Sequence, residues 1–286
     1  MIIRRITTTI LPIFFLLGIT CALANEKVTF PSEPIPPSAF KAKQAKAKGI
    51  TLLPTPGIDI TGFVFRPEVS SPRPAVITLV SGDGLQNSHL EWGETLASWG
   101  YVNLLVDSFG SRGGTNRRDT NNANMYTDAY NAYRFLRTQD YVDPDQIALI
   151  GFSLGGSSLF SILNKSNPRR PVDITFQAGV ALYPNCDTGI ELNAPLMILQ
   201  GDSDPINSSF SCETVSSEAP KWGNDISYYL YPDATHFYDN KNYSKVVGER
   251  DKAAPLPFQF EMNHYNKAAH EDSLIRTKAF LGQYLK

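Results

Sequence analysis

The chain of 286 residues contains few cysteines and histidines and little excess charge of either sign. Its three Cys and four His form no Cys-x-x-Cys motif and no His/Cys cluster, so the sequence predicts no metal site. The formal net charge is −2 and no basic face is present, which argues against nucleic-acid binding. With 42% hydrophobic and 19% charged residues, the composition excludes collagen-like, disordered and small disulfide-scaffold proteins.

The apolar run near the N-terminus is too short to span a bilayer. It covers about ten residues, 10–19, whereas a membrane-spanning helix needs roughly 20. Arg4 and Arg5 precede this run and Ala22, Leu23 and Ala24 follow it, which is the pattern of a secretory signal peptide. We therefore expect a cut after Ala24 that removes residues 1–24 and leaves a secreted or periplasmic protein with no stable membrane insertion. A retained membrane anchor is the alternative.

Export changes the interpretation of the cysteines. Removal of Cys21 with the leader leaves Cys186 and Cys212 in an oxidising compartment, where a pair is more often bridged than free. The sequence thus predicts a disulfide between them, and two unrelated buried thiols are the alternative.

The body of the chain alternates short apolar runs with helical patterns. Residues 25–49 are rich in Pro and then Lys, and we expect them to wrap the surface with at most one short helix. Residues 50–286 show no repeat and no linker, which predicts one domain with a mostly parallel sheet covered by helices on both faces. The expected strands are 50–53, 58–65, 75–80, 102–106, 147–151, 179–182, 196–199 and 226–231, and the expected helices are 88–99, 122–138, 155–164, 208–217 and 266–285.

The most informative motif is Gly-Phe-Ser-Leu-Gly-Gly at 151–156. It directly follows an expected strand and precedes an expected helix, which is the context of a Ser nucleophile on a sharp strand-to-helix turn. The flanking glycines suit such a crowded turn, and the N-terminus of the following helix favours developing negative charge. Ser153 is therefore the candidate nucleophile.

A Ser nucleophile needs a base and a group that orients the base. Asp204 and His236 each lie just beyond the C-terminal end of an expected strand, the edge at which open α/β sheets bind ligands. The chain order Ser153, Asp204, His236 is that of an α/β-hydrolase triad. Asp202 is the competing acid, and the Gly-x-x-Asp spacing favours Asp204.

The other three histidines have simpler interpretations. We expect His264 and His270 to be solvated residues at the start of the last helix. His89 lies near the start of another helix, where it either caps that helix or lines the cleft.

Stabilisation of an oxyanion needs two backbone donors. The N–H of Leu154, next to the nucleophile, is expected to be one. The loop Ser-Gly-Asp-Gly at 81–84 is expected to supply the other from Asp83 or Gly84, and an ordinary Gly-rich turn is the alternative interpretation.

Over most of residues 60–286 the chain resembles the dienelactone hydrolase family. The resemblance rests on Ser-Gly-Asp-Gly-Leu at 81–85, Asp-Ser-Phe-Gly-Ser-Arg-Gly at 107–113, the Ser153 turn, Tyr-Pro-Asn-Cys at 183–186, Gly-Asp-Ser-Asp at 201–204 and Ala-Thr-His-Phe at 234–237. It implies an α/β-hydrolase fold and a metal-free, cofactor-free hydrolase of esters or lactones, with secreted relatives that share the Cys pair. The chain departs from the family in having Ser153 where the namesake enzymes have Cys, and Ser81 where many relatives have His.

Three further residues are candidates for substrate binding. Arg112 could bind a substrate carboxylate through its bidentate guanidinium, or pair with Asp107 or another scaffold acid. Phe237 and Tyr238 begin a long loop, 237–264, that also carries Tyr243, Phe258 and Phe260. We expect this loop to form an aromatic wall of an open cleft. About a dozen residues separate the strands 179–182 and 196–199, too few for a large cap domain.

Together these features predict a serine hydrolase that cleaves a small or exposed carboxylic ester or lactone through an acyl-enzyme on Ser153. A serine peptidase or acyltransferase on the same fold is the first alternative, because all three share acyl-enzyme chemistry. A non-catalytic binding protein is the second, because a fold does not fix a function. The sequence does not specify an oligomeric state.

Overall fold

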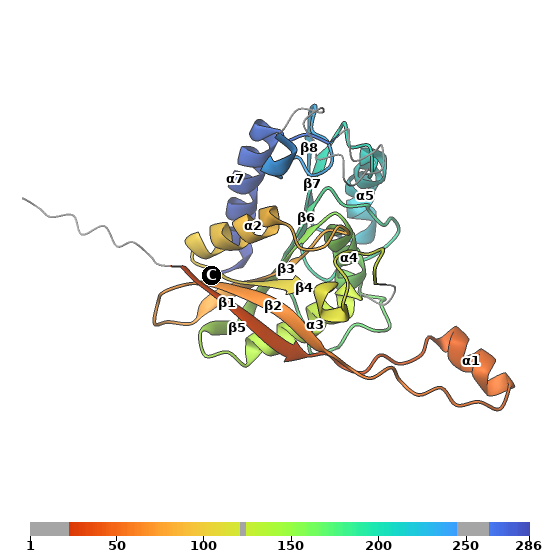
Figure 1. Cartoon of the computed structure of the whole chain (residues 1–286). Coiled ribbons are helices and arrows are strands. Elements are labelled where there is room, and N and C mark those ends of the chain that lie inside the picture. Colours follow the sequence, from red (N-terminus) through yellow and green to blue (C-terminus); the bar gives the residue numbers. More distant parts are fainter. Residues whose placement is uncertain (1–22, 121–123, 245–262) are drawn as a thin grey trace, which may run out of the picture.

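The computed structural model describes residues 23–120, 124–244 and 263–286, with the side chains of 23–25 and 244 excepted. Its centre is a mixed sheet of eight strands in the order β1-β2-β4-β3-β5-β6-β7-β8 (Figure 1). The pairs β1·β2 and β2·β4 are antiparallel and all the others are parallel. The strands are β1 (Leu23–Pro31), β2 (Asp59–Pro67), β3 (Arg73–Leu79), β4 (Val102–Asp107), β5 (Val142–Phe152), β6 (Gly179–Leu182), β7 (Leu196–Gly201) and β8 (Ile226–Tyr231).

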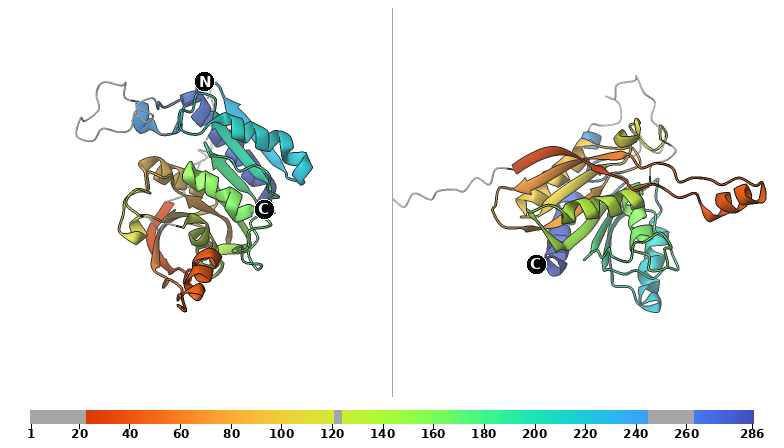
Figure 2. Two further views of the ribbon diagram at one scale, coloured as in Figure 1. Left: turned by 90° about the vertical axis from the view of Figure 1, so that its right-hand side faces the viewer. Right: turned by 90° about the horizontal axis from the view of Figure 1, so that it is seen from below.

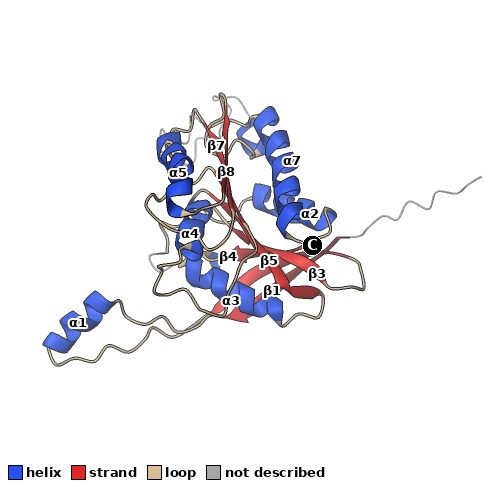
Figure 3. Ribbon diagram, turned by 180° about the vertical axis from the view of Figure 1, so that it is seen from behind, coloured by secondary structure: helices blue, strands red, loops and turns tan. Residues whose placement is uncertain are grey.

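Helices cover both faces of the sheet, as Figure 3 shows from behind. One core joins α3, α4 and α5 to the sheet, through side chains such as Tyr130, Leu159 and Val215. The other joins α2 and α7 to the opposite face, through Trp92 and Leu281 among others. The α-helices are α1 (Ala39–Ala47), α2 (Asn87–Ser98), α3 (Met125–Arg137), α4 (Leu154–Leu163), α5 (Ser209–Trp222) and α7 (Lys267–Tyr284), and the 3₁₀ turns are η1 (Gly110–Arg112) and η2 (Lys241–Ser244).

The fold-class prediction is confirmed, because the chain forms a mostly parallel sheet with helices on both faces. Strands such as β3 and β7 are mostly apolar and almost entirely buried, since each has a helix layer above and below it. Between β6 and β7, residues 183–195 contain no helix, so no cap domain is inserted there. In the part of the chain that the structure describes, no helix is both long and apolar enough to cross a membrane.

The N-terminal region differs from the expectation of a wrapping segment. β1 pairs with β2 over its whole length and forms the edge of the sheet. Residues 32–58 then form an arm that projects from the body and carries α1, the expected short helix (Figures 1 and 2). The strand predicted at 50–53 is wrong: these residues are an exposed connection in the arm, where they pair with no other strand. The expected cut after Ala24 falls inside β1, and a chain starting at Asn25 would keep most of that pairing.

The predicted disulfide is present. Cys186, after β6, and Cys212, in α5, are joined by an S–S bond of 2.06 Å. The bond holds α5 to the loop at the C-terminal end of β6, at the edge where the candidate site residues lie.

Candidate active site

Ser153 occupies a sharp turn between β5 and α4. Its φ of 51° and ψ of −111° lie in a region that non-glycine residues rarely adopt. A Cβ on Gly151 would lie 2.5 Å from the Gly155 carbonyl carbon, and one on Gly155 would overlap the Leu79 carbonyl oxygen. The two glycines are therefore needed to bring α4 against β5 and β3, and this packing raises Ser153 above the edge of the sheet.

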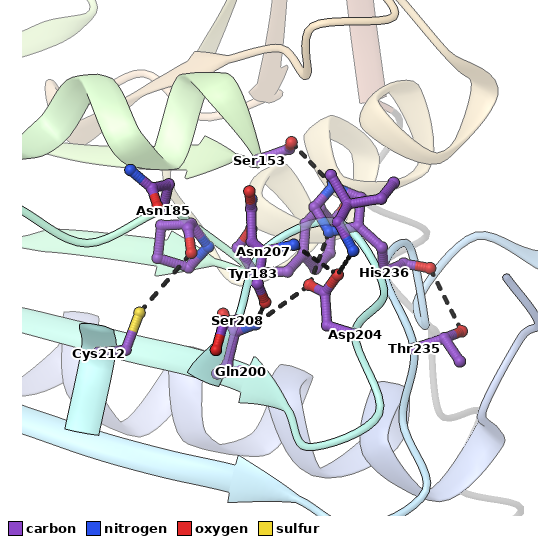
Figure 4. A network of polar contacts seen from close by, with 12 residues as sticks. Ser153, Tyr183, Asn185, Gln200, Asp204, Asn207, Ser208, Cys212, Thr235 and His236 are labelled. Atoms are coloured by element: carbon purple, nitrogen blue, oxygen red, sulfur yellow. Dashed lines mark hydrogen bonds and ion pairs between the residues drawn. The ribbon is translucent and has the colours of Figure 1, made fainter. Parts of the chain in front are cut away.

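The structure brings the three predicted triad residues together. His236 Nε2 lies 2.8 Å from Ser153 Oγ, and His236 Nδ1 lies 2.7 Å from Asp204 Oδ2 (Figure 4). With the proton on Nδ1, the imidazole donates to Asp204 and accepts from the Ser153 hydroxyl, which is the arrangement of a general base. Asp204 follows β7, His236 follows β8 and Ser153 follows β5, so parallel strand ends deliver all three.

Asp204, and not Asp202, contacts the histidine. Asp204 Oδ1 accepts hydrogen bonds from the backbone N–H groups of Ile206 and Asn207, at 2.8 and 2.9 Å. Its Oδ2 accepts one from the Gln200 side chain at 3.1 Å in addition to the contact with His236. These donors hold the carboxylate in place. Asp202 accepts instead from Ser203 Oγ and from the Asp233 N–H, on the outer side of the loop.

Two backbone N–H groups are available near Ser153 to stabilise an oxyanion. Leu154 is the first residue of α4, so its N–H has no acceptor one turn earlier in the helix. In the loop 81–84, the Gly84 N–H donates to the Ser81 carbonyl at 3.0 Å, which makes Gly84 unsuitable as the second donor. The Asp83 N–H has no acceptor among the described residues, and Gly82 approaches the Leu154 side chain. Asp83 is therefore the better candidate.

The side chain of Asp83 is close enough to the site to sense its charge. Burial raises the pKa of this carboxyl, while the charges of His236, Arg118 and Arg117 lower it. The net shift is upward because the loss of hydration of this carboxyl outweighs the three positive charges.

A buried polar cluster behind His236 was not predicted from the sequence. Tyr183 follows β6, and its ring centroid lies 4.8 Å from that of His236. Its hydroxyl donates to Asp239 Oδ1 at 2.9 Å, and Trp92 Nε1 donates to Asp239 Oδ2 at 2.8 Å. Burial raises the pKa of Asp239, against the effects of the Trp92 hydrogen bond, the His270 charge and the Tyr183 hydrogen bond. The sequence offers one signal of this cluster, which is that Asp239 lies three residues after the candidate base His236.

The structure changes the interpretation of the predicted substrate-binding residues. Arg112 pairs with the buried Asp128 through two bonds of 2.8 Å and donates to the Ser108 carbonyl, so it is a scaffold residue. Tyr238 is fully buried and therefore cannot form part of a cleft wall. Phe237 lies 4.3 Å from His236, ring to ring, and stacks on Tyr243. Phe258 and Phe260 lie outside the described residues.

Of the other three histidines, His89 and His270 are buried and have structural roles, and His264 is exposed. His89 Nδ1 accepts from the Gln86 N–H at 3.0 Å and so caps α2, and burial lowers the pKa of its imidazole to about 3. His270 is buried beside Trp92, which corrects the expectation of a solvated residue, and burial lowers its pKa. His264 is exposed as expected, although it precedes α7 and does not belong to it.

Comparisons with known proteins give one family and many structures of the same fold. The profile of the Dienelactone hydrolase family matches residues 60–285. A search of curated protein sequences finds no significant match.

Among solved structures, a putative dienelactone hydrolase from Klebsiella pneumoniae is 16% identical with a TM-score of 0.64, over 92% of this chain and 100% of that chain. A dienelactone hydrolase-like promiscuous phosphotriesterase from metagenomic libraries is 16% identical with a TM-score of 0.66, over 93% and 100%. Thermogutta terrifontis esterase 2, bound to butyrate, is 15% identical with a TM-score of 0.59, over 80% and 91%. With the family profile matching most of the chain and these structures sharing its α/β-hydrolase fold, the protein belongs to the dienelactone hydrolase family.

Proposed function

We propose that this protein is a serine hydrolase that cleaves small or exposed carboxylic esters or lactones through an acyl-enzyme on Ser153. The observation that carries the proposal is the continuous chain of hydrogen bonds from Ser153 Oγ through the His236 imidazole to the Asp204 carboxylate. A hydroxyl held 2.8 Å from a buried imidazole nitrogen can lose its proton as it attacks a carbonyl.

In the proposed reaction each of these groups has its own step. Ser153 Oγ attacks the ester carbonyl carbon while its proton passes to His236 Nε2. Asp204 stabilises the imidazolium that results, and the N–H groups of Leu154 and Asp83 bind the oxyanion. The imidazolium then returns the proton to the departing alcohol. Water repeats the sequence on the acyl-enzyme, so His236 again acts first as base and then as acid.

The proposed substrate size follows from what surrounds the site. No cap domain is inserted between β6 and β7, so nothing at that position closes over Ser153. Ser153 is partly exposed, whereas His236 is 1% exposed. A small acyl group, or an ester presented on a larger body, can reach such a hydroxyl. A relative of the same fold, esterase 2, has been captured with butyrate, which is a small acid.

We also propose that the protein is exported. The N-terminal pattern of residues 1–24 is one support, and the disulfide between Cys186 and Cys212 is a second, because such bonds persist in oxidising compartments. Intact mass of the protein recovered from the periplasm or medium tests this directly. A mass that begins at Asn25 supports export with the expected cut, and a mass that retains residues 1–24 contradicts it.

The proposed chemistry is tested by labelling with a fluorophosphonate serine probe, followed by intact mass. Thermogutta terrifontis esterase 2 has been seen phosphorylated by paraoxon, so a phosphorus electrophile is a suitable probe for this fold. We expect one adduct per chain, lost in Ser153→Ala and in His236→Ala. Unlabelled wild-type protein with native circular dichroism would contradict an activated Ser153. Ester and amide substrates with the same acyl group then separate an esterase from a peptidase.

A further inference from the structure

The arm of residues 32–58 lies outside the segment matched by the family, 60–285, and has an unusual surface. Of the ten exposed large apolar side chains in the described part of the chain, five lie in or at the base of this arm. They are Phe40 at 69% exposed, Ile50 at 53%, Leu52 at 40%, Leu53 at 82% and Ile58 at 38%. Apolar side chains gathered on one exposed segment point to a binding surface.

The arm is also basic. Residues 32–58 contain four lysines and one acid, Glu33, which pairs with Arg134 of the body. The base of the arm is fixed by hydrogen bonds between its two limbs: the Ser32 N–H donates to Ile58, and Ile35 and Thr55 form a two-way backbone bridge. These hydrogen bonds fix the base of the arm where it leaves the body, and from there the arm projects outward (Figure 2).

A groove of about 750 Å³ lies between the arm and the body, a volume in the range of small-molecule sites. The arm supplies Ile35, Leu52 and Leu53 to its lining. The body supplies Met125 from α3 and Leu154 from α4. Since Leu154 directly follows Ser153 and its N–H is a candidate oxyanion donor, the groove reaches the residue next to the proposed nucleophile.

The polar groups of the groove are basic. Lys41, in the first turn of α1, and Arg169, on the body, both line it and are both exposed. Tyr126 orients Arg169: the guanidinium donates a hydrogen bond to the Tyr126 hydroxyl and lies 5.9 Å from the ring centroid. The described residues that line the groove include no Asp or Glu. A groove that combines apolar side chains, Leu154 among them, with two cations is complementary to an apolar chain that carries an anionic group.

We propose that this groove is the specificity site of the enzyme, and that it binds an ester substrate in which an apolar chain carries an anionic group such as a carboxylate. This inference rests on the proposed function, because it places the scissile ester at Ser153. Leu52, Leu53 and Met125 contact the chain, and Lys41 and Arg169 pair with its anionic end. The arm, which the family match does not include, thus provides one wall of the substrate site.

The first experiment compares matched esters on the wild-type protein. The para-nitrophenyl monoester of adipic acid carries a free carboxylate, and para-nitrophenyl hexanoate has the same chain length without it. A second pair places the carboxylate on the alcohol portion, using acetate esters of hydroxyhexanoic acid and of hexanol. We expect a higher kcat/KM for the anionic member of at least one pair, with a preference that falls as salt is added.

Variants then test which residues cause the preference. We expect Lys41→Gln and Arg169→Gln each to raise KM for the anionic ester by up to about fivefold, the upper range for an exposed ion pair, and to change KM for the neutral ester by less. Lys43→Gln is the matched control, because Lys43 lies on the same helix and does not line the groove. Leu53→Ser should weaken the binding of both the anionic and the neutral ester of a pair. Val172→Ser is its control, because Val172 is also exposed.

A binding measurement separates this inference from the proposed function. Ser153→Ala protein is titrated calorimetrically with the adipate monoester, with and without Arg169→Gln. Weaker binding of the monoester when Arg169→Gln is added to Ser153→Ala supports the groove as the substrate-binding site, even where turnover is slow. If all the esters are hydrolysed at rates that neither Lys41→Gln nor Arg169→Gln alters, the groove is not the specificity site. The proposed hydrolase function would still stand. Absence of hydrolysis together with absence of binding would overturn both.

Discussion

The Tyr183 hydroxyl donates a hydrogen bond to the fully buried carboxylate of Asp239 at 2.9 Å, and the Tyr183 ring packs on the His236 imidazole with 4.8 Å between ring centroids. Tyr183 has a φ of 40°, a backbone conformation that needs support from its surroundings. Asp239 thus anchors the hydroxyl of a side chain whose ring contacts the proposed base at an interplanar angle of 60°. We therefore expect Tyr183 and Asp239 to help position the His236 imidazole.

Tyr183→Phe should lower both stability and turnover. The change removes one donor from a buried carboxylate and is expected to cost about 1–3 kcal/mol in the free energy of unfolding, measured by urea titration. The phenyl ring still packs on His236, so kcat should fall less than in a triad variant. A double-mutant cycle with Asp239→Asn checks the cause: additive losses would contradict a direct coupling between the two side chains.

Asp204→Asn should reduce kcat by about 10⁴-fold with little change in thermal stability, because the new side chain no longer holds the imidazole in the productive tautomer. Its amide oxygen can still accept from the Ile206 and Asn207 N–H groups, so the loop should keep its shape. The matched control is Asp202→Asn, in the same loop. Steady-state hydrolysis of para-nitrophenyl butyrate by the control should be close to wild type, and an equal loss in both variants would disprove the assignment.

His89 should make the protein sensitive to acid. Burial lowers the pKa of its imidazole from 6.5 to about 3, so between these pH values the unfolded chain binds the proton and the folded chain does not. Stability is therefore complete above pH 6.5 and is lost as the pH falls, by up to about 1.4 kcal/mol per pH unit.

The measurement is the urea midpoint as a function of pH for wild type and His89→Gln. The glutamine oxygen can still accept from the Gln86 N–H and keep the cap. We expect a flatter pH dependence in this variant. His264→Gln is the control, because His264 is exposed, and it should follow the wild-type curve.

Arg112→Gln should affect stability and leave substrate binding unchanged. The change removes the partner of Asp128, whose side chain is 0% exposed, and such a loss costs about 3–5 kcal/mol. Urea unfolding measures the loss, and KM for para-nitrophenyl butyrate should equal that of wild type. Replacing both partners, Arg112→Met with Asp128→Leu, should recover most of the stability. A raised KM with unchanged stability would instead restore the substrate-binding interpretation.

Reduction of the disulfide should lower the melting temperature. A bond that joins residues 26 apart contributes about 3.5 kcal/mol in the chain-entropy model, or roughly 10 °C for a protein of this size. Differential scanning calorimetry with and without dithiothreitol measures this shift. The double variant Cys186→Ala, Cys212→Ala should melt at the reduced temperature and show no response to the reductant.

Much of the fold could be predicted because its signals are local. Each of the strands β2 to β8 was expected from a short apolar run, and each helix of the body from a helical pattern between or after those runs. β1 was missed because Val28 and Phe30 give only a short alternation next to a Pro-rich segment, and the pairing that forms the strand comes from β2. The strand expected at 50–53 has the right composition, but the arm offers it no partner.

The sequence by itself determined the fold class, the disulfide and the identity of Ser153, Asp204 and His236 as neighbours. Parallel strands end at one edge, so residues that follow those ends in the chain must meet there. Only the tertiary structure decided which side chains support them. Trp92 and Asp239, which form a hydrogen bond, are 147 residues apart in the sequence. Arg112 pairs with Asp128 and not with Asp107, which is nearer to it in the sequence. Residues of the arm line the same groove as Leu154. These contacts depend on how separate elements pack against each other, and no local pattern in the sequence encodes that.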